Sequence, residues 1–279
     1  MEIIETPRHV RLALGLKEPG LVPTMGALHE GHLSLIRRSA AENSRTVVSI
    51  FVNPLQFNDA RDLEAYPRTF DRDIQLAEQA GADIIFAPTP ALLYPEGFST
   101  TVAVAGLADR WEGAVRPGHF TGVTTVVSKL FNIVEPANAY FGEKDYQQLA
   151  IIRRMHADLN WFGDIVGCPT VRDHDGLALS SRNSRLSVEQ RQIAPIVPRT
   201  LFTLRDRANA GDHNAASVIE HGLALLAQEL SIEVDYLAIV DPETLEPVKE
   251  ILPGSRALIA VKLGPIRLID NLALLEPPQ

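Results

Sequence analysis

The chain has 279 residues and a formal net charge of −9 at pH 7. This length corresponds to one large or two modest domains, and a composition of 46% hydrophobic and 22% charged residues excludes a disordered chain. The net negative charge argues against a protein that binds nucleic acid by neutralising its phosphates. A local basic pocket is still compatible with this overall charge.

A single cysteine, Cys168, excludes an intrachain disulfide and a zinc site built from several thiolates. It has no motif around it, and we expect it in a buried strand. The first residues lack the basic-then-apolar pattern of a secretory signal, and no run of about 18 apolar residues predicts a membrane helix. We therefore expect a soluble, cytoplasmic protein with no membrane partner.

The first part of the chain alternates short apolar runs with amphipathic segments. The pattern predicts strands over residues 21–25, 46–52, 82–87 and 139–141, and helices over residues 33–42, 70–80, 121–134 and 145–159. Alternation of strands and helices is typical of a doubly wound α/β sheet, so we expect a Rossmann-like parallel sheet.

The pattern changes after about residue 172. Residues 172–185 are polar and aperiodic and predict a loop, after which Ser187 and Gln190 form a capping box that opens a helix. Pro195 and Pro198 are expected to bend or split that helix. A further helix is predicted over residues 212–230, and strands over residues 234–240, 256–261 and 266–269. We therefore expect two domains, residues 1–174 and residues 175–279.

The most informative segment covers residues 23–37, where a predicted strand ends at Met25 and a helix begins near His32. Gly26 supports a tight turn, which would place His29 and His32 beside the exposed backbone N–H groups of a helix start. Such a start attracts anions, and imidazoles there can bind phosphate oxygens or donate a proton to departing pyrophosphate. Alternatively, both histidines only cap the helix, but their paired spacing favours phosphate chemistry.

Residues 51–58 follow the second predicted strand, at the edge where open α/β sheets bind ligands. Asn53 and Gln56 carry neutral amides suited to the hydroxyls and carboxylate of a small polar substrate. By itself the segment is equally compatible with an ordinary loop.

Two weaker candidates lie further along the chain. Asp71 and Asp73 could help to hold magnesium, but a solvated helix face is the favoured interpretation of this pair. Arg116 and His119 offer two more anion contacts, with a less specific pattern.

Residues 141–148 again combine a strand end, a glycine and a helix start. Lys144 supplies a point charge for phosphate, and Asp145 could accept from a ribose hydroxyl or cap the helix. Gln148, one helical turn later, would share a face with Lys144. The alternative is a charged first helical turn without a ligand.

The loop after the first domain contains Ser180, Ser181 and Arg182. Two hydroxyls and a guanidinium on a mobile linker suit a lid that closes over a triphosphate and stabilises charge at the transferring phosphorus. The tripeptide alone is common in loops, so by itself it is weak evidence for a phosphate site. It becomes informative because the same chain also contains the histidine pair.

Several other catalytic motifs are absent. The sequence has no Gly-x-x-x-x-Gly-Lys-[Ser/Thr] phosphate loop, no Gly-x-Ser-x-Gly nucleophile elbow and no His-Glu-x-x-His zinc helix. What remains is phosphate handling with little covalent chemistry by the protein.

Together these residues resemble the pantothenate synthetase (pantoate–β-alanine ligase) family. The resemblance covers nearly the whole chain and includes residues 23–32, 51–58, 66–69, 116–122, 141–148, 175–183, 240–248 and 267–271. The family is similar in fold to class I aminoacyl-tRNA synthetases and nucleotidylyltransferases, whose His-x-Gly-His signature corresponds to residues 29–32 and whose mobile lysine–serine loop corresponds to residues 180–182. The resemblance implies a Rossmann-like sheet of the nucleotidylyltransferase type with a smaller α+β C-terminal lid domain.

The resemblance also implies a reaction. ATP, pantoate and β-alanine would give pantothenate, AMP and pyrophosphate through a pantoyl-adenylate, with magnesium accompanying the triphosphate. The family is typically a homodimer, so a second copy of the chain is the expected partner besides the small molecules, with no nucleic acid and no membrane.

Carried over residue by residue, the resemblance assigns roles to the candidates. Catalysis would fall to the proton donor His32 together with His29, Lys144, Ser180, Ser181 and Arg182. The ATP site would comprise Met25, Gly26, Ala27, Leu28, His29, Glu30, Gly31, His32, Gly142, Glu143, Lys144, Asp145, Val171, Leu179, Ser180, Ser181 and Arg182. Pantoate and β-alanine would be bound by Asn53, Gln56 and Gln148, with Gln56 contacting both. The metal ligands are not assigned.

One residue departs from the family pattern. Leu179 stands where the family usually has methionine, and its similar volume implies a packing adjustment rather than lost chemistry. The paired prolines at 195 and 198 are also unusual.

Two other functions stay open. A nucleotidylyltransferase would share the histidine pair but transfer AMP or CMP to a phosphorylated acceptor, whereas the amides at 53, 56 and 148 favour an acceptor with carboxylate and hydroxyl groups. A nucleotide-binding sensor would bind ATP without turnover, which the intact set of catalytic candidates argues against.

Overall fold

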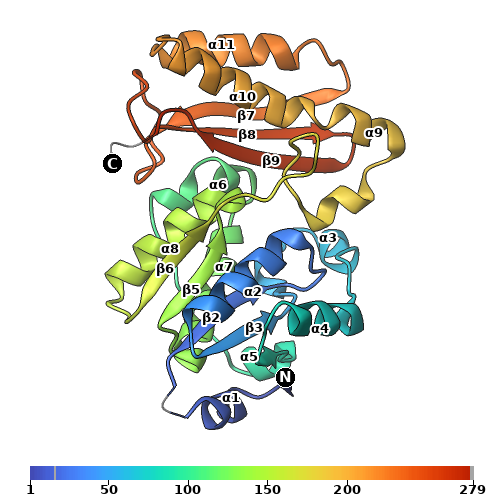
Figure 1. Cartoon of the computed structure of the whole chain (residues 1–279), viewed down its shortest axis with the longest axis vertical. Helices are drawn as coiled ribbons and strands as arrows, with labels where there is room; N and C mark the ends of the chain where they lie inside the picture. The colour runs from blue at the N-terminus through green and yellow to red at the C-terminus, as the bar shows by residue number, and fades with distance from the viewer. Residues whose placement is uncertain (16, 277–279) are drawn as a thin grey trace. The chain divides into compact units, whose positions relative to one another are not determined.

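The computed structural model describes residues 1–15 and 17–276. The chain folds into two compact units, shown in Figure 1. Unit 1 comprises residues 1–143 and 147–169, and unit 2 comprises residues 144–146 and the chain from residue 170 onward. Each unit has its own sheet and its own hydrophobic core, so the two are described separately.

Unit 1 is built on a six-stranded sheet in which every neighbouring pair is parallel. Its strands, in spatial order, are β1 (Glu2–Ile4), β4 (Ile84–Phe86), β3 (Arg45–Ile50), β2 (Pro19–Thr24), β5 (Asn138–Gly142) and β6 (Asp164–Cys168). The chain moves outward from β2 to β4 and then continues on the other side with β5 and β6. The order therefore reverses between β2 and β5, and open α/β sheets bind ligands at the carboxyl ends of strands around such a switch point.

Both faces of this sheet are covered. Leu21 and Val22 are consecutive in β2, point to opposite faces, and are both 0% exposed, as in a parallel sheet with helices on both sides. The helices of unit 1 are α1 (Pro7–Leu14), α2 (Glu30–Glu42), α3 (Ala60–Glu64), α4 (Phe70–Gln79), α5 (Pro90–Leu93), α6 (Glu112–Val115), α7 (His119–Val134) and α8 (Tyr146–Asp158), which begins in unit 2. Short 3₁₀ helices cover Pro54–Gln56 (η1), Leu107–Asp109 (η2) and Glu143–Asp145 (η3).

Unit 2 pairs two helices with a three-stranded antiparallel sheet in the order β7 (Ile232–Val240), β8 (Arg256–Leu263) and β9 (Ile266–Ala273). Helices α10 (Ile196–Asn209) and α11 (Ala215–Leu226) pack together and against the sheet, as Figure 1 shows. Buried side chains from both helices and all three strands form one core. Two shorter elements precede them, η4 (Ser181–Arg185) and α9 (Val188–Ile193).

The prolines divide the first helical segment of unit 2, as predicted. Helix α9 ends at Ile193, Pro195 is the N-cap residue of α10, and Pro198 lies in the first turn of α10. A proline is tolerated there because the N–H groups of a first turn have no intrahelical acceptor.

The loop predicted over residues 172–185 was wrong in two places. Arg172 and Ala178 form an antiparallel bridge around a turn, and residues 181–185 form η4. Gly176 permits that turn because its φ of 87° lies in the left-handed region that favours glycine. A short hairpin of this kind has no hydrophobic periodicity, so the sequence pattern could not reveal it.

The predicted fold class is confirmed by the parallel sheet of unit 1 and the smaller α+β unit 2. Cys168 lies in β6 and is buried, as predicted. The elements β1, α1, α3, α5 and α6, each of eight residues or fewer, were not predicted. Among the described residues, no helix combines the length and apolar character needed to cross a membrane.

Candidate active site

The turn between β2 and α2 carries the histidine pair, and residues 25–32 are called the histidine turn from here on. β2 ends at Thr24, whose hydroxyl donates to the carbonyl of Ser49 in β3 and accepts from the backbone N–H of Gly26. Gly26 and Ala27 both have positive φ, 79° and 50°. This left-handed pair reverses the chain tightly, so that α2 starts at the carboxyl edge of the sheet.

The two imidazoles lie against each other at the start of α2. The ring centroids of His29 and His32 are 4.1 Å apart, and a Cβ atom added to Gly31 would stand 2.9 Å from Cε1 of His29. A side chain at position 31 would therefore displace the imidazole.

One hydrogen bond sets the tautomer of His32. The backbone N–H of His29 donates to Nδ1 of His32 at 3.4 Å. A backbone N–H can only donate, so in the neutral ring the proton lies on Nε2. Nε2–H of His32 is thus the ring group that can donate a hydrogen bond to a ligand.

A buried carboxylate holds the histidine turn. Asp73 in α4 is 1% exposed and accepts hydrogen bonds from the backbone N–H groups of Ala27 and Leu28 at 2.9 and 2.8 Å. The hydroxyl of Thr69 lies 3.1 Å from both carboxylate oxygens. The interpretation of Asp73 as part of a solvated helix face was therefore wrong, whereas Asp71 is exposed.

This anchor uses two backbone donors that precede the helix. The N–H groups of Ala27 and Leu28 bind Asp73 and fix the shape of the backbone, so they are not directed to a phosphate. The predicted anion contacts at the start of α2, which begins at Glu30 after the N-cap His29, do not depend on these two groups.

The loop after β3, residues 51–58, is called the amide loop from here on. Asn53 and Gln56 are buried in it, and Nδ2 of Asn53 donates to Oε1 of Gln56 at 3.0 Å. Nε2 of Gln56 lies 3.1 Å from Sδ of Met25 in the histidine turn. The structure thus brings the predicted nucleotide turn and the predicted acid-binding loop together within unit 1.

Helix α7 packs against the amide loop and binds it through a backbone carbonyl. Nδ2 of Asn53 also donates to the carbonyl of Gly122 at 3.0 Å. A Cβ atom added to Gly122 would stand 2.3 Å from the carbonyl oxygen of Leu55, so only glycine permits this approach. The backbone of the loop and the backbone of the helix are therefore in direct contact.

Arg116 and His119 contact the amide loop rather than an open anion site. Nδ1 of His119 lies 2.8 Å from the carbonyl oxygen of Gln56, and Nη2 of Arg116 donates to the same oxygen at 3.3 Å. Nη1 of Arg116 lies 3.2 Å from Nε2 of His119. Both side chains therefore fix the main chain at Gln56.

The segment at the end of β5, residues 142–145, belongs partly to each unit. Gly142 and Glu143 belong to unit 1, whereas Lys144 and Asp145 belong to unit 2. The α-helix begins at Tyr146, one residue later than predicted, and Lys144 lies in the 3₁₀ turn that leads directly into it. The Lys144 ammonium lies 3.4 Å from Oδ1 of Asp145.

Side chains of unit 2 hold the Lys144 segment. Nδ2 of Asn271 in β9 donates to the carbonyl of Lys144 at 2.8 Å, and the guanidinium of Arg256 lies 3.8 Å from the ring centroid of Tyr146. Asn271 also accepts a hydrogen bond from Arg256. These contacts fix the backbone from which the Lys144 side chain extends.

The remaining ATP candidates lie around the hairpin of unit 2. Val171 and Leu179 face each other across it, with the Leu179 N–H donating to the Val171 carbonyl at 3.0 Å. Ser180 caps η4 by accepting from the N–H of Arg182, and Ser181 and Arg182 form its first residues. The serine–serine–arginine segment therefore forms the N-cap and the first two residues of a 3₁₀ helix.

Ion pairs hold the base of this hairpin. Arg172 forms a bidentate ion pair with the buried Asp270, with Nη1–Oδ2 and Nη2–Oδ1 distances of 2.6 and 3.0 Å. Arg191 binds both Asp173 and Asp175. Hydrogen bonds from His174 and Arg191 lower the pKa of Asp173 to about 2.

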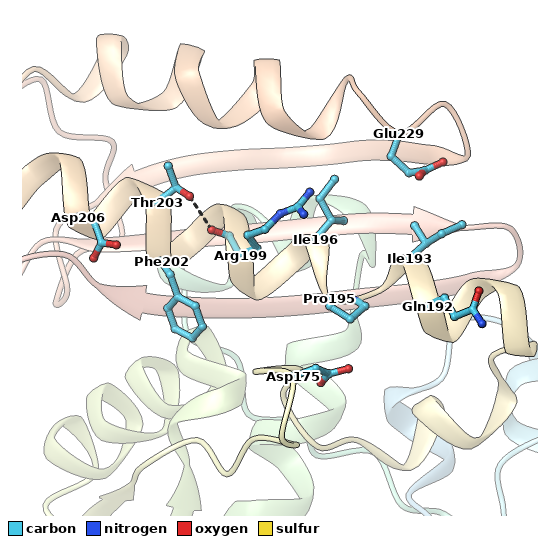
Figure 2. A pocket seen from close by; sticks show the side chains of 10 residues that line it. All are labelled: Asp175, Gln192, Ile193, Pro195, Ile196, Arg199, Phe202, Thr203, Asp206 and Glu229. Atoms are coloured by element: carbon cyan, nitrogen blue, oxygen red, sulfur yellow. Dashed lines mark hydrogen bonds between the residues drawn. The ribbon is translucent and has the colours of Figure 1, made fainter.

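A separate cavity of about 590 Å³ lies in unit 2 and is shown in Figure 2. None of the predicted site residues lines it. Its walls are Asp175, Gln192, Ile193, Pro195, Ile196, Arg199, Phe202, Thr203, Asp206 and Glu229. One guanidinium faces three carboxylates there, which is a poor composition for binding phosphate.

No cluster of three or more His, Cys, Asp or Glu side chains in the described part of the chain is arranged to hold a metal ion. Cys168 is buried, and this burial raises the pKa of its thiol even though Arg38 lies 3.9 Å from its sulfur. The thiol is therefore protonated and shielded, unlike a nucleophilic cysteine.

The sequence analysis did not predict the supporting role of Asp73, which it had named as a possible magnesium ligand, and it did not single out Tyr94. Asp73 had a usable signal, because it shares a helical face with Ala77, and an acidic residue on an apolar face is unusual. Tyr94, whose hydroxyl donates to Asn53 at 2.8 Å, follows the four-residue helix α5 and had none.

Comparison with known proteins agrees with this architecture. The family model described as pantoate-beta-alanine ligase matches residues 2–273. The pantothenate synthetase of Thermus thermophilus is 50% identical over 98% of this chain and 99% of its own length. That of Deinococcus radiodurans is 52% identical over 93% of this chain and 94% of its own length.

Two solved structures extend the similarity to the fold. A crystal structure of the Thermus thermophilus enzyme matches with a TM-score of 0.96 at 49% identity, covering 99% of this chain and 100% of that one. The Francisella tularensis pantoate-beta-alanine ligase, complexed with beta-gamma ATP and beta-alanine, matches with a TM-score of 0.80 at 33% identity over 98% of each chain. This chain belongs to the pantoate–β-alanine ligase family and is a ligase that joins pantoate to β-alanine.

Proposed function

We propose that the chain uses ATP to activate pantoate as a pantoyl-adenylate and then transfers the pantoyl group to β-alanine. The observation that carries this proposal is the contact between Met25 and Gln56. It joins the turn expected to bind ATP to the loop expected to bind the acid. An acid and a nucleotide bound next to each other are the two reactants of an adenylation.

In the first step, a carboxylate oxygen of pantoate attacks the α-phosphorus of ATP. The bond from that phosphorus to the bridging oxygen breaks, and pyrophosphate leaves. We assign Nε2–H of His32 as a hydrogen-bond donor that stabilises the negative charge of the departing pyrophosphate, rather than as the proton donor that the resemblance implies, since a ring whose Nδ1 accepts a backbone hydrogen bond is neutral. His29 packs against the His32 ring and would help to hold it in place.

In the second step, the amine of β-alanine attacks the carbonyl carbon of the adenylate. The carbon–oxygen bond to the phosphate breaks, AMP leaves with the bonding electron pair, and the new amide nitrogen loses a proton. Gln56 and Asn53 would orient pantoate, and Gln148, in the first turn of α8, would contact its other end.

The other predicted residues would bind the nucleotide. The backbone of the histidine turn and residues 142–143, 171 and 179 would line the ATP site. Lys144, Ser180, Ser181 and Arg182 would stabilise the negative charge that develops on the phosphates. Magnesium would enter as the MgATP complex and draw charge from the leaving pyrophosphate.

The wider predictions rest on the resemblance. We propose that residues 1–174 bind ATP and pantoate, that residues 175–279 act as a lid, and that the chain works as a cytoplasmic homodimer.

Isotope exchange between pyrophosphate and ATP tests the adenylate. With MgATP and pantoate present and β-alanine absent, we expect labelled pyrophosphate to enter ATP, and no exchange without pantoate. If exchange is absent while the complete reaction still releases AMP, the three substrates react together and the proposed intermediate is wrong. A stable nucleotidyl product without amide formation would instead identify a nucleotidylyltransferase.

A further inference from the structure

Three side chains of unit 1 form a chain of hydrogen bonds that ends in the amide loop. The hydroxyl of Tyr94 donates to Oδ1 of Asn53 at 2.8 Å, and Nδ2 of Asn53 donates to Oε1 of Gln56 at 3.0 Å. Asn53 and Gln56 are 1% and 8% exposed. A buried chain of this kind has a direction, because every group in it is either a donor or an acceptor.

The main chain fixes that direction at Asn53. Oδ1 of Asn53 also accepts from the backbone N–H of Leu55 at 3.3 Å, while Nδ2 also donates to the carbonyl of Gly122 at 3.0 Å. A backbone N–H can only donate and a carbonyl can only accept, so the Asn53 amide has one allowed orientation. Tyr94 must therefore be the donor, and burial raises the pKa of Tyr94, which keeps its hydroxyl protonated.

The orientation of Gln56 follows from that of Asn53. Its Oε1 faces the Asn53 donor, so its NH₂ group points the other way, toward the sulfur of Met25 at 3.1 Å. A thioether is a weak acceptor, and a carboxylate or hydroxyl oxygen would be a much better partner for these N–H groups. The backbone of Gln56 cannot shift to compensate, since its carbonyl is held by Arg116 and His119.

We propose that Tyr94 is a positioning residue of the acid-binding site, which acts through Asn53 to hold Gln56 with its NH₂ group toward the ligand. Gln56 then serves as a donor that selects the oxygens of pantoate and does not attract the ammonium group of β-alanine. This inference rests on the proposed placement of Gln56 in the pantoate site.

A Tyr94→Phe substitution tests this role cleanly. It keeps the ring, which packs against Phe98 at 5.0 Å and Phe51 at 6.1 Å between centroids, and removes only the hydroxyl. Asn53 keeps its two main-chain bonds, so Gln56 is loosened rather than released. We expect the KM for pantoate to rise by about three- to tenfold, while kcat and the KM for ATP stay within about twofold.

Tyr140→Phe is the matched control. Tyr140 is a buried tyrosine of β5 in the same unit, and its hydroxyl binds Glu42 and Asn43 at the carboxyl end of α2. The same atom is lost there, away from the amide loop, so the KM for pantoate should not change. If Tyr94→Phe shifts stability but leaves the pantoate KM as unchanged as the control does, Tyr94 is only structural and the proposal fails.

A double-mutant cycle separates this proposal from the one on which it rests. Gln56→Ala alone should raise the pantoate KM by more than about tenfold, and adding Tyr94→Phe to it should have no further effect, because the group being positioned is gone. If Gln56→Ala leaves the pantoate KM unchanged, the placement of Gln56 is wrong. If Gln56→Ala raises the KM but Tyr94→Phe adds the same factor in both backgrounds, only the positioning role is wrong.

Discussion

The histidine turn and the amide loop follow neighbouring parallel strands, yet distant residues hold them by different chemical means. Asp73 holds the histidine turn with a carboxylate that binds backbone N–H groups. Tyr94 holds the amide loop through neutral groups that bind side chains. The first arrangement fixes where the main chain runs, and the second fixes which way an amide faces.

This difference matches what each segment must do. A turn that places a catalytic hydrogen-bond donor needs a rigid backbone, because small displacements of a catalytic group reduce rates strongly. A loop that recognises a substrate needs the correct pattern of donors and acceptors. Changes in the histidine turn should therefore reduce kcat or stability, and changes in the amide loop or in Gln148 should alter the KM for pantoate.

The largest effect is expected from His32→Ala. Loss of the hydrogen bond to the departing pyrophosphate should lower kcat by about 10²- to 10³-fold, with the KM for pantoate changed by less than about threefold. Steady-state kinetics with each substrate varied in turn would measure both constants. His9→Ala removes an exposed imidazole of α1 and should leave them unchanged. Near-normal turnover of His32→Ala would remove His32 from the mechanism.

Asp73→Ala should come next. Two backbone N–H groups would lose their acceptor in a buried position, and we expect a loss of about 3 kcal/mol in the free energy of unfolding. Urea titration measures this, and the KM for ATP should rise in the folded fraction. Asp71→Ala, in the same helical turn but exposed, should change neither. Equal effects of the two substitutions would mean that Asp73 does not hold the turn.

Gln148→Ala should affect recognition alone, by about tenfold in the KM for pantoate, since one hydrogen bond to the substrate is lost. Its neighbour provides the contrast. Gln147 is buried and binds the N–H of Glu112 and the carbonyls of Leu107 and Arg110, so Gln147→Ala should lower the melting temperature. An unchanged response to pantoate in Gln148→Ala would reject the placement of Gln148.

The smallest effect concerns Asp173 in the hairpin of unit 2, a more exposed carboxylate that binds Arg191 and His174. The folded-state pKa of Asp173, about 2, lies below its ordinary value, so its contribution to stability is present above about pH 4 and is lost as the pH falls toward 2. Asp173→Asn should therefore be slightly less stable than the parent at neutral pH and equal to it near pH 2. A difference that grows on acidification would contradict this sign.

The sequence was sufficient to predict the segments whose signal is local. The histidine turn and the amide loop both follow apolar runs, and their polar residues are close in the chain. The split helix of unit 2 was also predictable, since Pro195 and Pro198 act on their own backbone.

The supports of these segments could not be predicted in the same way. Asp73 lies 46 residues from Ala27, and Tyr94 lies 41 residues from Asn53, so only the packing of the sheet and its helices brings each pair together. The direction of the Gln56 amide depends on the carbonyl of Gly122, 69 residues from Asn53. The direction of such a hydrogen-bond chain can be assigned only when the positions of all its donors and acceptors are known.

Gly122 shows what such a support means for mutational surveys. The amide loop lies against α7 at a point where the helix contributes a carbonyl group and no side chain. Alanine scanning usually detects a residue by removing its atoms, but at Gly122 it would act by adding a Cβ atom 2.3 Å from the carbonyl oxygen of Leu55. If Gln56 binds pantoate as proposed, Gly122→Ala would weaken pantoate binding although position 122 contributes no side chain, because the distance between the two backbones sets the position of the Gln56 amide.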